Sequence, residues 1–360
     1  MSNGHVFVAM SGGVDSSVAA VLLQQAGYQL SGVNLRMFHN EDLNESPSRT
    51  CCSLTDAEDA ALVARRLGFP FYVFDFAQAF RDTVIRNFIE EYQQGRTPNP
   101  CAECNRSVKF GALLQRVRTL GGDYMATGHY ARVERDEASG RYLLKRGKDH
   151  SKDQSYFLYM LTQEELAHTL FPLGGMEKSE VRQIAEANGL VNAKKRDSQD
   201  ICFVPDGKYA DFIERTTGQP SVPGPFVDQE GRVLGLHKGI IRYTKGQHKR
   251  LGLSTEQPLY VLEKDIASNT IRLGPDSALW SHTLTAERMN WISVPELDGP
   301  MAVTVKTRYT QREAAAVAEP LAGGRIRVTF EEPQRAITAG QAVVLYDDDT
   351  VVGGGTICGT

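Results

Sequence analysis

The chain has 360 residues, of which 41% are hydrophobic and 23% charged, and its formal net charge at pH 7 is −4. This length is too great for one compact core, and the composition excludes a wholly disordered chain. No apolar run reaches the roughly 20 residues that span a bilayer, and the start MSNGHVFVAM lacks the features of a secretory signal. We therefore expect a cytoplasmic protein of two or three domains, without a membrane partner, whose six cysteines are thiols or metal ligands.

Strands and helices are predicted to alternate through the first half of the chain. Apolar stretches with the length of strands lie at 5–10, 29–38, 70–76 and 124–130. The segments with helical periodicity lie at 16–27, 55–68, 78–95 and 107–121. Strands separated by helices of this length predict an α/β fold with a doubly wound parallel sheet.

The pattern changes near Pro205. Short alternating stretches punctuated by Gly and Pro follow it, such as MAVTVKTRY and GRIRVTFEEP. This pattern predicts a C-terminal β-barrel that is preceded by a small module. We therefore predict an N-terminal domain at 1–205, a small central domain at 206–277 and a barrel domain at 278–360.

The stretch VAMSGGVDSS joins the first predicted strand to the first predicted helix. Gly12 and Gly13 allow a sharp turn that presents backbone N–H groups to an anion, and the start of the helix favours phosphate. The lysine of the Walker A pattern is absent, and Asp15 is suited instead to bind Mg²⁺ beside a polyphosphate. A plain glycine turn is the alternative, but glycines and serines in this order favour a nucleotide site.

SGGVDSS resembles the pyrophosphate loop of the N-type ATP pyrophosphatases. The resemblance implies that ATP is cleaved to pyrophosphate and that AMP is transferred to an oxygen atom of the substrate, from which a nucleophile displaces it. Members that form amides need no cysteine, so the thiols of this chain are informative. We interpret Cys51, Cys52 and Cys358 as incidental thiols. On its own, Cys202 is either a small buried residue or a reactive thiol.

Segments in the same order along nearly the entire chain resemble the bacterial and organellar tRNA-specific 2-thiouridylases. They are GRTPNPCAECN, ATGHY, SKDQSYFLY, LFPLG, KKRDSQDICF, YTKGQHKRLGL, VKTRYTQ and GGGTI. The resemblance implies a nucleotide-binding α/β domain, a small central domain and a C-terminal β-barrel. It also implies an ATP-dependent sulfurtransferase that converts the C2 carbonyl of the wobble uridine of tRNA into a thiocarbonyl.

The family pattern gives two cysteines a role. The cysteine of the ICF motif, Cys202 here, carries sulfur as a persulfide, and the cysteine that precedes asparagine after PNP is Cys104. ATP turns the carbonyl oxygen into a leaving group, and a deprotonated persulfide is a strong nucleophile. The Cys104 thiol then releases the sulfur by exchange, which implies a transient Cys104–Cys202 disulfide. A sulfur-donor protein, such as a cysteine desulfurase or a relay carrier, is the implied partner besides tRNA.

Cys101 departs from one version of the family motif, in which an aspartate follows the second proline. An acid/base role does not carry over directly, because a thiol and a carboxyl group titrate differently. The departure brings Cys101, Cys104 and Cys202 to one site, and three thiolates with an open fourth position could hold a [4Fe–4S] cluster. A structural zinc would need a fourth ligand. Persulfide chemistry is the favoured hypothesis, and the cluster is the alternative, with Cys101 as assisting thiol or ligand.

The resemblance also assigns binding residues. Those for ATP are Ala9, Met10, Ser11, Gly12, Gly13, Val14, Asp15, Ser16, Met37 and Gly128. Those for the anticodon loop of tRNA are Asn99, Pro100, Cys101, His129, Lys152, Asp153, Gln154, Arg308, Tyr309 and Gln341. Lys and Arg supply phosphate contacts, whereas Tyr and His offer faces on which a flipped base can stack. On pattern alone, Arg308 and Tyr309 are equally well an exposed strand pair.

Two other functions compete with thiolation. An amide-forming ligase of the same superfamily would lack a use for the paired cysteine motifs, and the chain has no glutaminase segment that we recognise. A non-catalytic RNA-binding protein would not need the intact SGGVDSS loop together with Cys104 and Cys202. Both alternatives are therefore less well supported than the sulfurtransferase.

Overall fold

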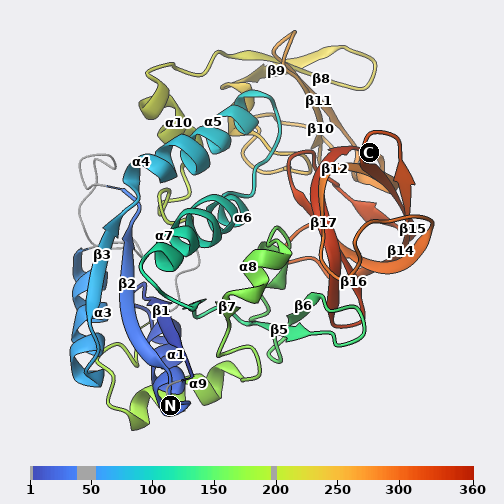
Figure 1. Cartoon of the computed structure of the whole chain (residues 1–360). Coiled ribbons are helices and arrows are strands. Elements are labelled where there is room, and N and C mark those ends of the chain that lie inside the picture. The colour runs from blue at the N-terminus through green and yellow to red at the C-terminus, as the bar shows by residue number, and fades with distance from the viewer. Residues whose placement is uncertain (1–2, 39–53, 196–200) are drawn as a thin grey trace.

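The computed structural model describes residues 3–38, 54–195 and 201–360. Figure 1 shows an α/β part that contains the N-terminus, a smaller part with strands β8 to β11, and a barrel that contains the C-terminus. Within the described residues, no helix is both long enough and apolar enough to cross a membrane.

The N-terminal part is built on a parallel sheet. Its strands are β1 (His5–Ala9), β2 (Gln29–Arg36), β3 (Phe71–Asp75), β4 (Tyr124–Ala126) and β7 (Thr169–Leu170), in the order β3-β2-β1-β4-β7. All pairings in this sheet are parallel, which confirms the predicted α/β fold. The strand order reverses at β1, which pairs with β2 on one side and β4 on the other. Ligands of open α/β sheets bind at the carboxyl ends of the strands at such a switch point.

The two faces of this sheet pack against separate helix layers. Val6 and Val8 of β1 lie in one hydrophobic cluster with α1 (Val14–Gln25), α3 (Leu54–Leu67) and α9 (Lys178–Ala187). Phe7, between them, lies in the other cluster. Side chains that alternate along a strand point to opposite faces, so β1 is buried on both sides.

The second layer contains a helix that matches the segment predicted at 78–95. It runs through α4 (Ala77–Phe80), wider π-type turns at Arg81–Ile85, and α5 (Arg86–Gln93). Its buried aromatic side chains, Phe80 and Phe88, pack edge-to-face against Phe203.

The other helix of this layer begins earlier than the sequence pattern predicts. It comprises α6 (Pro100–Cys104), π-type turns at Asn105–Leu113, and α7 (Leu114–Thr119), whereas the prediction began it at residue 107. The Oδ1 atom of Asn99 accepts a hydrogen bond from the backbone N–H of Ala102 at 3.2 Å. Asparagine at the N-cap followed by proline is a favourable helix start. The cysteine pair therefore lies inside the helix rather than before it.

The rest of the N-terminal part connects to the barrel. A hairpin of β5 (Ala131–Arg135) and β6 (Tyr142–Arg146) is followed by a 3-10 turn at Ser155–Phe157 and by α8 (Gln163–Ala167). Strand β6 also pairs with the last strand of the chain, antiparallel to it, with Lys145 opposite Thr350. The hairpin is thus part of the barrel's eight-stranded sheet.

The central part combines one helix with a small sheet. The helix is α10 (Tyr209–Thr217), and the strands are β8 (Gly224–Val227), β9 (Val233–His237), β10 (Tyr260–Asp265) and β11 (Thr270–Gly274). The sheet order is β10-β11-β8-β9, and a 3-10 turn lies at Ile240–Arg242. A core around Phe226 and Tyr243 holds this part together.

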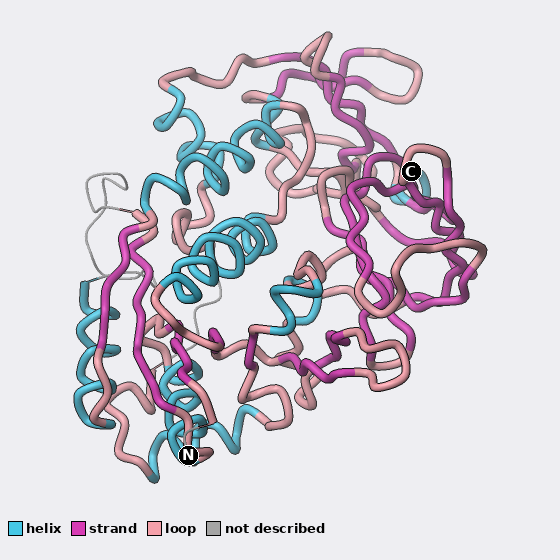
Figure 2. Tube along the Cα trace, in the orientation of Figure 1, coloured by secondary structure: helices cyan, strands magenta, loops and turns pink. Residues whose placement is uncertain are grey.

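The C-terminal part is the predicted β-barrel, which Figure 2 shows as strands joined by loops. Its strands are β12 (Trp280–Trp291), β13 (Met301–Lys306), β14 (Ala314–Leu321), β15 (Arg325–Arg335), β16 (Ala342–Asp347) and β17 (Thr350–Gly359), preceded by a 3-10 turn at Asp276–Leu279. The barrel closes because β12 pairs with both β15 and β17. The domain borders at 205 and 277 stay predictions.

Candidate active site

The loop between β1 and α1 lies at the switch point of the sheet. Gly12 has a φ of +74°, and a Cβ atom there would lie 2.2 Å from the backbone oxygen of Asp56. The hydroxyl of Ser16 accepts a hydrogen bond from Ser11 N–H at 3.3 Å and donates one to the Gly13 oxygen at 3.2 Å. Both the backbone conformation and the lack of space therefore require glycine at position 12. The Ser16 hydroxyl joins the two ends of the loop through its hydrogen bonds to Ser11 and Gly13.

A second loop, after β4, packs directly against the first turn of α1. A Cβ atom at Gly128 would lie 2.7 Å from the backbone nitrogen of Ser16. Met37 follows β2 and is buried. The predicted ATP residues of the first loop are thus brought together with Gly128 at the carboxyl edge of β1 and β4, and Met37 lies at the end of the neighbouring strand.

Asp15 has partners other than the Mg²⁺ ion predicted from the sequence. Lys178 Nζ donates to both carboxylate oxygens, at 2.7 and 2.8 Å, and the Tyr130 hydroxyl donates to Oδ1 at 2.8 Å. A carboxylate whose oxygens are both held by an ammonium group does not fit a metal ligand. We therefore derive no step through Mg²⁺ at Asp15, whose side chain instead joins α1 to α9.

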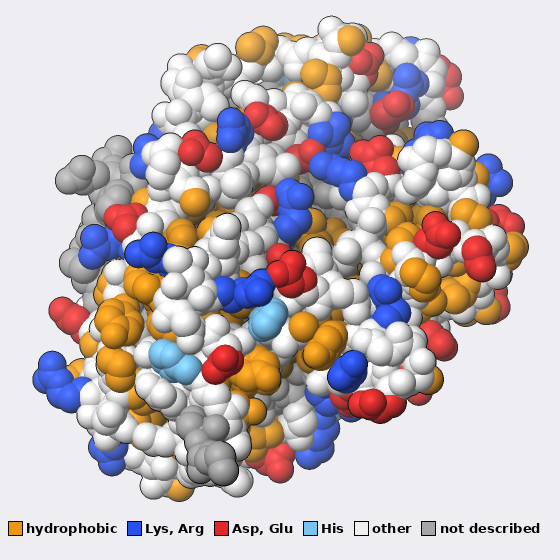
Figure 3. All heavy atoms as spheres, viewed as in Figure 1, with side chains coloured by type: hydrophobic (Ala, Val, Ile, Leu, Met, Phe, Trp, Pro, Cys, Tyr) orange, Lys and Arg blue, Asp and Glu red, His pale blue; other side chains and the backbone are white. Residues whose placement is uncertain are grey.

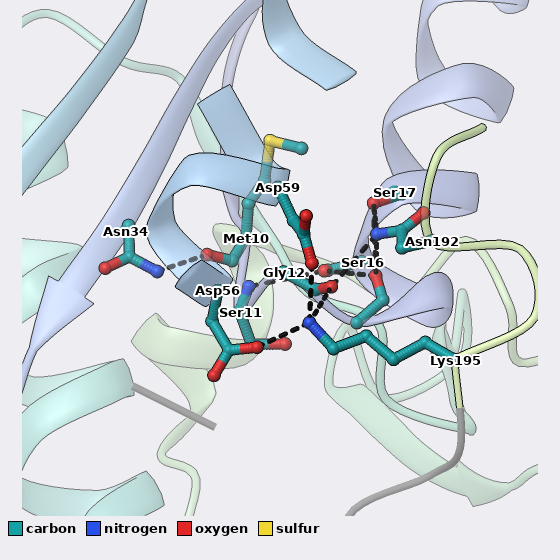
Figure 4. A network of polar contacts seen from close by, with 11 residues as sticks. Met10, Ser11, Gly12, Ser16, Ser17, Asn34, Asp56, Asp59, Asn192 and Lys195 are labelled. Atoms are coloured by element: carbon teal, nitrogen blue, oxygen red, sulfur yellow. Dashed lines mark hydrogen bonds and ion pairs between the residues drawn. The ribbon is translucent and has the colours of Figure 1, made fainter. Parts of the chain in front are cut away.

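Two residues that the sequence analysis did not single out contact the same loop. Asn192 Nδ2 donates to the carbonyl oxygens of Gly12 at 3.0 Å and Gly13 at 3.2 Å. Lys195 Nζ donates to the Gly12 oxygen at 3.2 Å. Figure 4 shows both side chains reaching the loop from the segment after α9. These contacts join positions about half the chain apart, so no local motif could have predicted them.

Cys104 lies near the nucleotide edge of the sheet. Its side chain is 7% exposed, and its Sγ atom lies 3.8 Å from Sδ of Met37. Cys202 is half-buried and packs against the same hydrophobic cluster that contains Cys104. Cys101 is exposed, one helical turn before Cys104. The two cysteines with assigned roles are therefore brought to one cluster from positions far apart in the sequence.

The arrangement of the thiols bears on the predicted cluster and leaves the transient disulfide open to experiment. Cys101, Cys104 and Cys202 are all among the described residues, and within these no group of three or more Cys, His, Asp or Glu side chains is placed to hold a metal ion. As placed, the thiols do not fit a [4Fe–4S] cluster, and we derive no step through one. Cys104 and Cys202 are both thiols, so their transient disulfide stays a prediction.

The three cysteines interpreted as incidental need only brief description. Cys51 and Cys52 lie outside the described residues. Cys358 is exposed on β17, with its Sγ atom 3.5 Å from the Thr285 hydroxyl oxygen.

Several side chains that are predicted to contact tRNA form hydrogen bonds within the protein. Asp153 is 5% exposed, and its carboxylate accepts hydrogen bonds from the backbone N–H groups of Gly147 and Ser155, each at 3.1 Å. Asp153 therefore stabilises its own loop, and its contact with tRNA stays a prediction. Gln154 is also engaged, because its Oε1 atom accepts from Tyr130 N–H at 3.1 Å. Lys152, beside them, is half-buried.

The predicted barrel contacts hold neighbouring backbone. Gln341 Nε2 donates to the carbonyl oxygens of Thr97 at 2.9 Å and Pro98 at 3.0 Å, which fastens the segment before α6 to the barrel. Arg308 Nη2 donates to the Ala336 oxygen at 2.6 Å. The ring of Tyr309 is half-buried, with its centroid 4.5 Å from that of Phe157.

His129 lies in the loop that follows β4. Its Nδ1 atom is 2.6 Å from the Thr127 hydroxyl oxygen, and its ring lies about 6 Å from those of Phe110 and Phe171. Burial, together with the charge of Lys109, holds the pKa of His129 well below its usual range. His129 is therefore neutral near pH 7 and can offer a ring face or a single hydrogen bond, not a positive charge.

The side of α6 that faces the barrel lines a cavity of about 240 Å³. The cavity lies between α5, α6 and the barrel, and its polar lining residues include Asn87, Glu91, Asn99, Glu103, Arg106, Arg288 and Asn290. Asn99 is the one predicted tRNA residue in this lining.

The surface carries basic side chains although the chain has a net negative charge. On the face in Figure 3, Lys and Arg side chains lie across the middle of the molecule, with Asp and Glu side chains among them.

Family models match almost the whole chain. One described as "tRNA methyl transferase HUP domain" matches residues 4–206, which is more than half of the chain. Others, described as "tRNA methyl transferase PRC-barrel domain" and "Aminomethyltransferase beta-barrel domain", match residues 210–275 and 281–357. With the glycine loop at the switch point, these matches define a nucleotide-binding α/β protein of the HUP class, extended by two β-rich domains.

Curated relatives narrow the class to one family. The chain is 53% identical over 351 residues to "tRNA-specific 2-thiouridylase MnmA" of Moorella thermoacetica, covering 97% of this chain and 98% of that protein. It is 49% identical over 356 residues to "tRNA-specific 2-thiouridylase MnmA 1" of Caldanaerobacter subterraneus subsp. tengcongensis, covering 99% and 98%. The protein "tRNA-specific 2-thiouridylase MnmA 2" of Thermoanaerobacter sp. strain X514 is 48% identical with the same coverage. The chain belongs to the MnmA family of tRNA-specific 2-thiouridylases.

Proposed function

We propose that this chain is an ATP-dependent tRNA-uridine 2-sulfurtransferase. The observation that carries the proposal is the position of Cys104, whose Sγ atom lies 3.8 Å from Sδ of Met37, the residue that follows β2 at the carboxyl edge of the sheet. A thiol on a helix that contacts the end of β2, at the same carboxyl edge of the sheet as the glycine loop, suits the activation of a substrate oxygen followed by attack of sulfur. The description "methyl transferase" in the family models has no counterpart in this arrangement, whereas the names of the relatives agree with it.

The first step activates the wobble uridine. Its C2 oxygen attacks the α-phosphorus of ATP, pyrophosphate leaves, and the N3 proton of the base is lost. The backbone N–H groups that follow Gly12 and Gly13, at the start of α1, hold the phosphates and stabilise the charge on the departing pyrophosphate. The exclusion of a side chain at Gly128 keeps the backbone nitrogen of Ser16 accessible to the same anion.

The second step replaces oxygen by sulfur. The terminal sulfur of a Cys202 persulfide attacks C2, and AMP leaves, so that the base is joined to Cys202 by a disulfide. The Cys104 thiolate then attacks Sγ of Cys202, which forms a Cys104–Cys202 disulfide and releases the base as the thiocarbonyl, with a proton returned to N3. A dithiol reductant restores both thiols, and a persulfide-carrying donor protein reloads Cys202.

Substrate RNA has to reach this thiol from outside. Asn99, Pro100 and Cys101 form the first turn of α6 and its cap, and Cys101 is exposed there. We infer that this end of the helix meets the flipped base, and that Lys152, His129 and Tyr309 lie along the path of the anticodon loop. Gln341 contributes by fastening the segment before α6 to the barrel.

The proposal is tested by mass analysis of nucleosides from unmodified tRNA. The tRNA is incubated with the purified protein, ATP and a persulfide-loaded sulfurtransferase. We expect 2-thiouridine at the wobble position with wild type and none with Cys104→Ser or Cys202→Ser, both of which should still bind ATP. Wild-type protein that binds ATP and tRNA but leaves uridine unchanged would refute the proposed activity.

A Cys101→Asp variant tests the departure at the exposed position. Because the placed thiols do not fit a cluster, we expect this variant to retain thiolation within about threefold of wild type, a difference of less than 1 kcal/mol in the barrier. Loss of activity together with loss of bound iron after anaerobic purification would instead assign Cys101 to a cluster.

A further inference from the structure

We propose that Asn192 and Lys195 orient the peptide groups of the pyrophosphate loop and are positioning residues for ATP binding. This inference rests on the proposed use of that loop for ATP. It assigns a role to two side chains that lie far from the loop in sequence and beside it in space (Figure 4).

Two sets of side chains hold the peptide groups of this loop: the serine hydroxyls at the start of α1, and Asn192 and Lys195 from outside it. Neither Gly12 nor Gly13 has a side chain that could fix its peptide planes, and no Walker lysine is present. The carbonyl oxygen of Gly12 accepts hydrogen bonds from both Asn192 and Lys195. That of Gly13 accepts one from Asn192 in addition to those from the hydroxyls of Ser16 and Ser17.

Fixing these carbonyl groups also fixes the N–H groups that an anion would bind. In a trans peptide, the C=O and the following N–H point in opposite directions. With the oxygens of Gly12 and Gly13 directed toward Asn192 and Lys195, the N–H groups of Gly13 and Val14 point away from them. Successive N–H groups presented in this way form an anion-binding concavity.

The orientation of the Asn192 amide is determined by its partners. Its Nδ2 atom also lies 2.9 Å from the hydroxyl oxygen of Ser17, so three oxygen atoms surround it. The residue is 3% exposed, and its Oδ1 atom has no hydrogen-bond partner among the described residues. A flipped amide would place that oxygen against the three oxygens. The side chain is therefore held by its donor group, at the cost of a buried unpaired acceptor.

Lys195 adds a charge to the same support. Its Nζ atom donates to the carboxylates of Asp56 and, at 2.7 Å, Asp59, as well as to the loop. Asp56 lies against Gly12, so an uncompensated carboxylate there would repel the phosphates of ATP. Burial lowers the pKa of Lys195, but the hydrogen bonds and charges of Asp56 and Asp59 outweigh it and raise the pKa, so the ammonium group stays charged.

The test measures binding of a non-hydrolysable ATP analogue by calorimetry in the absence of tRNA. For Asn192→Ala and Lys195→Met we expect the Kd to rise about tenfold to a hundredfold, as for the loss of hydrogen bonds and a compensating charge. Lys195→Arg should restore part of the affinity. Lys194→Met is the matched control, because Lys194 is exposed beside Lys195, and it should bind as wild type does.

Two further readouts separate positioning from general damage. In steady-state thiolation, KM for ATP should rise in Asn192→Ala and Lys195→Met, while kcat at saturating ATP and Kd for tRNA stay within about twofold of wild type. An unchanged Kd for the analogue, or an equal weakening of tRNA binding, would overturn the inference. Failure of the wild-type protein to bind the analogue would refute the proposed function. This outcome is distinct from failure of the inference, which is judged from the variants against a wild type that does bind.

Discussion

At the scale of single residues, the candidate site depends on positions where a side chain would not fit. Gly12 is confined by its left-handed conformation and by the backbone of Asp56, and Gly128 by the first turn of α1. The turn at Gly12 is predictable from the local sequence, but the two close approaches are not, because each arises from a segment that is distant along the chain.

Gly128→Ala is expected to weaken ATP binding by at least about tenfold, because the added methyl group would occupy the space in front of the Ser16 N–H. Calorimetric titration with an ATP analogue checks this. Gly175→Ala is the matched control, since a Cβ atom there would have nothing within 4 Å. Equal affinities for the two variants would contradict the assigned geometry.

Lys264, in the central domain, gives a pH-dependent prediction. Its Nζ atom donates to the Tyr243 oxygen at 2.9 Å, and burial lowers the pKa of Lys264 to about 8. The unfolded chain, with a lysine pKa of about 10.4, binds more protons between these two values. The free energy of unfolding contributed by this group therefore rises with pH through that interval.

We expect the free energy of unfolding of Lys264→Met to exceed that of wild type most strongly below pH 8. The difference between the two proteins should shrink toward pH 10. Urea unfolding at pH 7 and pH 9.5 measures it. The exposed Lys238→Met variant should differ from wild type by an amount that does not change with pH. A constant difference for Lys264→Met would show that its ammonium group is not destabilised by burial.

At the scale of elements, the helix that starts with α6 carries Cys101 and Cys104. Its start was predicted at the first apolar periodicity, near residue 107, whereas Asn99 and Pro100 begin it seven residues earlier. The capping signal was present in the sequence and was outweighed by the helical pattern that follows. The strands β1, β2 and β3 match the predicted ranges closely, because each combines an apolar run with a flanking turn. The prediction at 124–130 extends past β4, and the two-residue strand β7 is too short to leave a pattern.

Gln341→Ala is expected to slow thiolation without changing ATP affinity. The substitution removes two hydrogen bonds that hold the backbone of Thr97 and Pro98 to the barrel, so the N-terminus of α6 would be less well ordered. A decrease in kcat of about fivefold to fiftyfold corresponds to one or two such bonds. Single-turnover kinetics with saturating tRNA checks it, and an unchanged rate constant would remove the proposed link between barrel and helix.

At the scale of the whole molecule, the barrel and the N-terminal domain share a sheet through β6 and β17. Arg146 of β6 strengthens this junction, since it is 7% exposed, forms an ion pair with Glu313 and lies 3.9 Å from the centroid of the Tyr346 ring. The alternating pattern of the sequence predicts the barrel and strands such as β13 and β15, but not this joint, because β-pairing between distant strands leaves no local signature.

Arg146→Ala is expected to lower the free energy of unfolding by about 3 kcal/mol or more, because Glu313 would be left as an uncompensated, partly buried charge. Arg132→Ala, which removes a more exposed ion pair with Asp349, is the control and should cost about 1 kcal/mol or less. Chemical denaturation of both variants provides the comparison. Similar small effects would indicate that the junction does not depend on Arg146.

The parts of the site that sequence could not predict are those made by tertiary contacts. SGGVDSS and the two cysteine motifs predict the chemistry because each motif is local. Asn192 and Lys195 lack any such pattern. The resemblance assigns Asp153 to tRNA binding, and the sequence carries no sign that backbone N–H groups of its own loop occupy its carboxylate.

The central claim is that the Cys202 persulfide transfers its terminal sulfur to the base, and that Cys104 then forms a disulfide with Cys202 as the thiolated base is released. The most direct measurement is peptide mass analysis after one turnover of persulfide-loaded protein with ATP and tRNA, without reductant. We predict one Cys104–Cys202 disulfide for each 2-thiouridine formed. Stoichiometric 2-thiouridine with both cysteines still reduced would contradict this account.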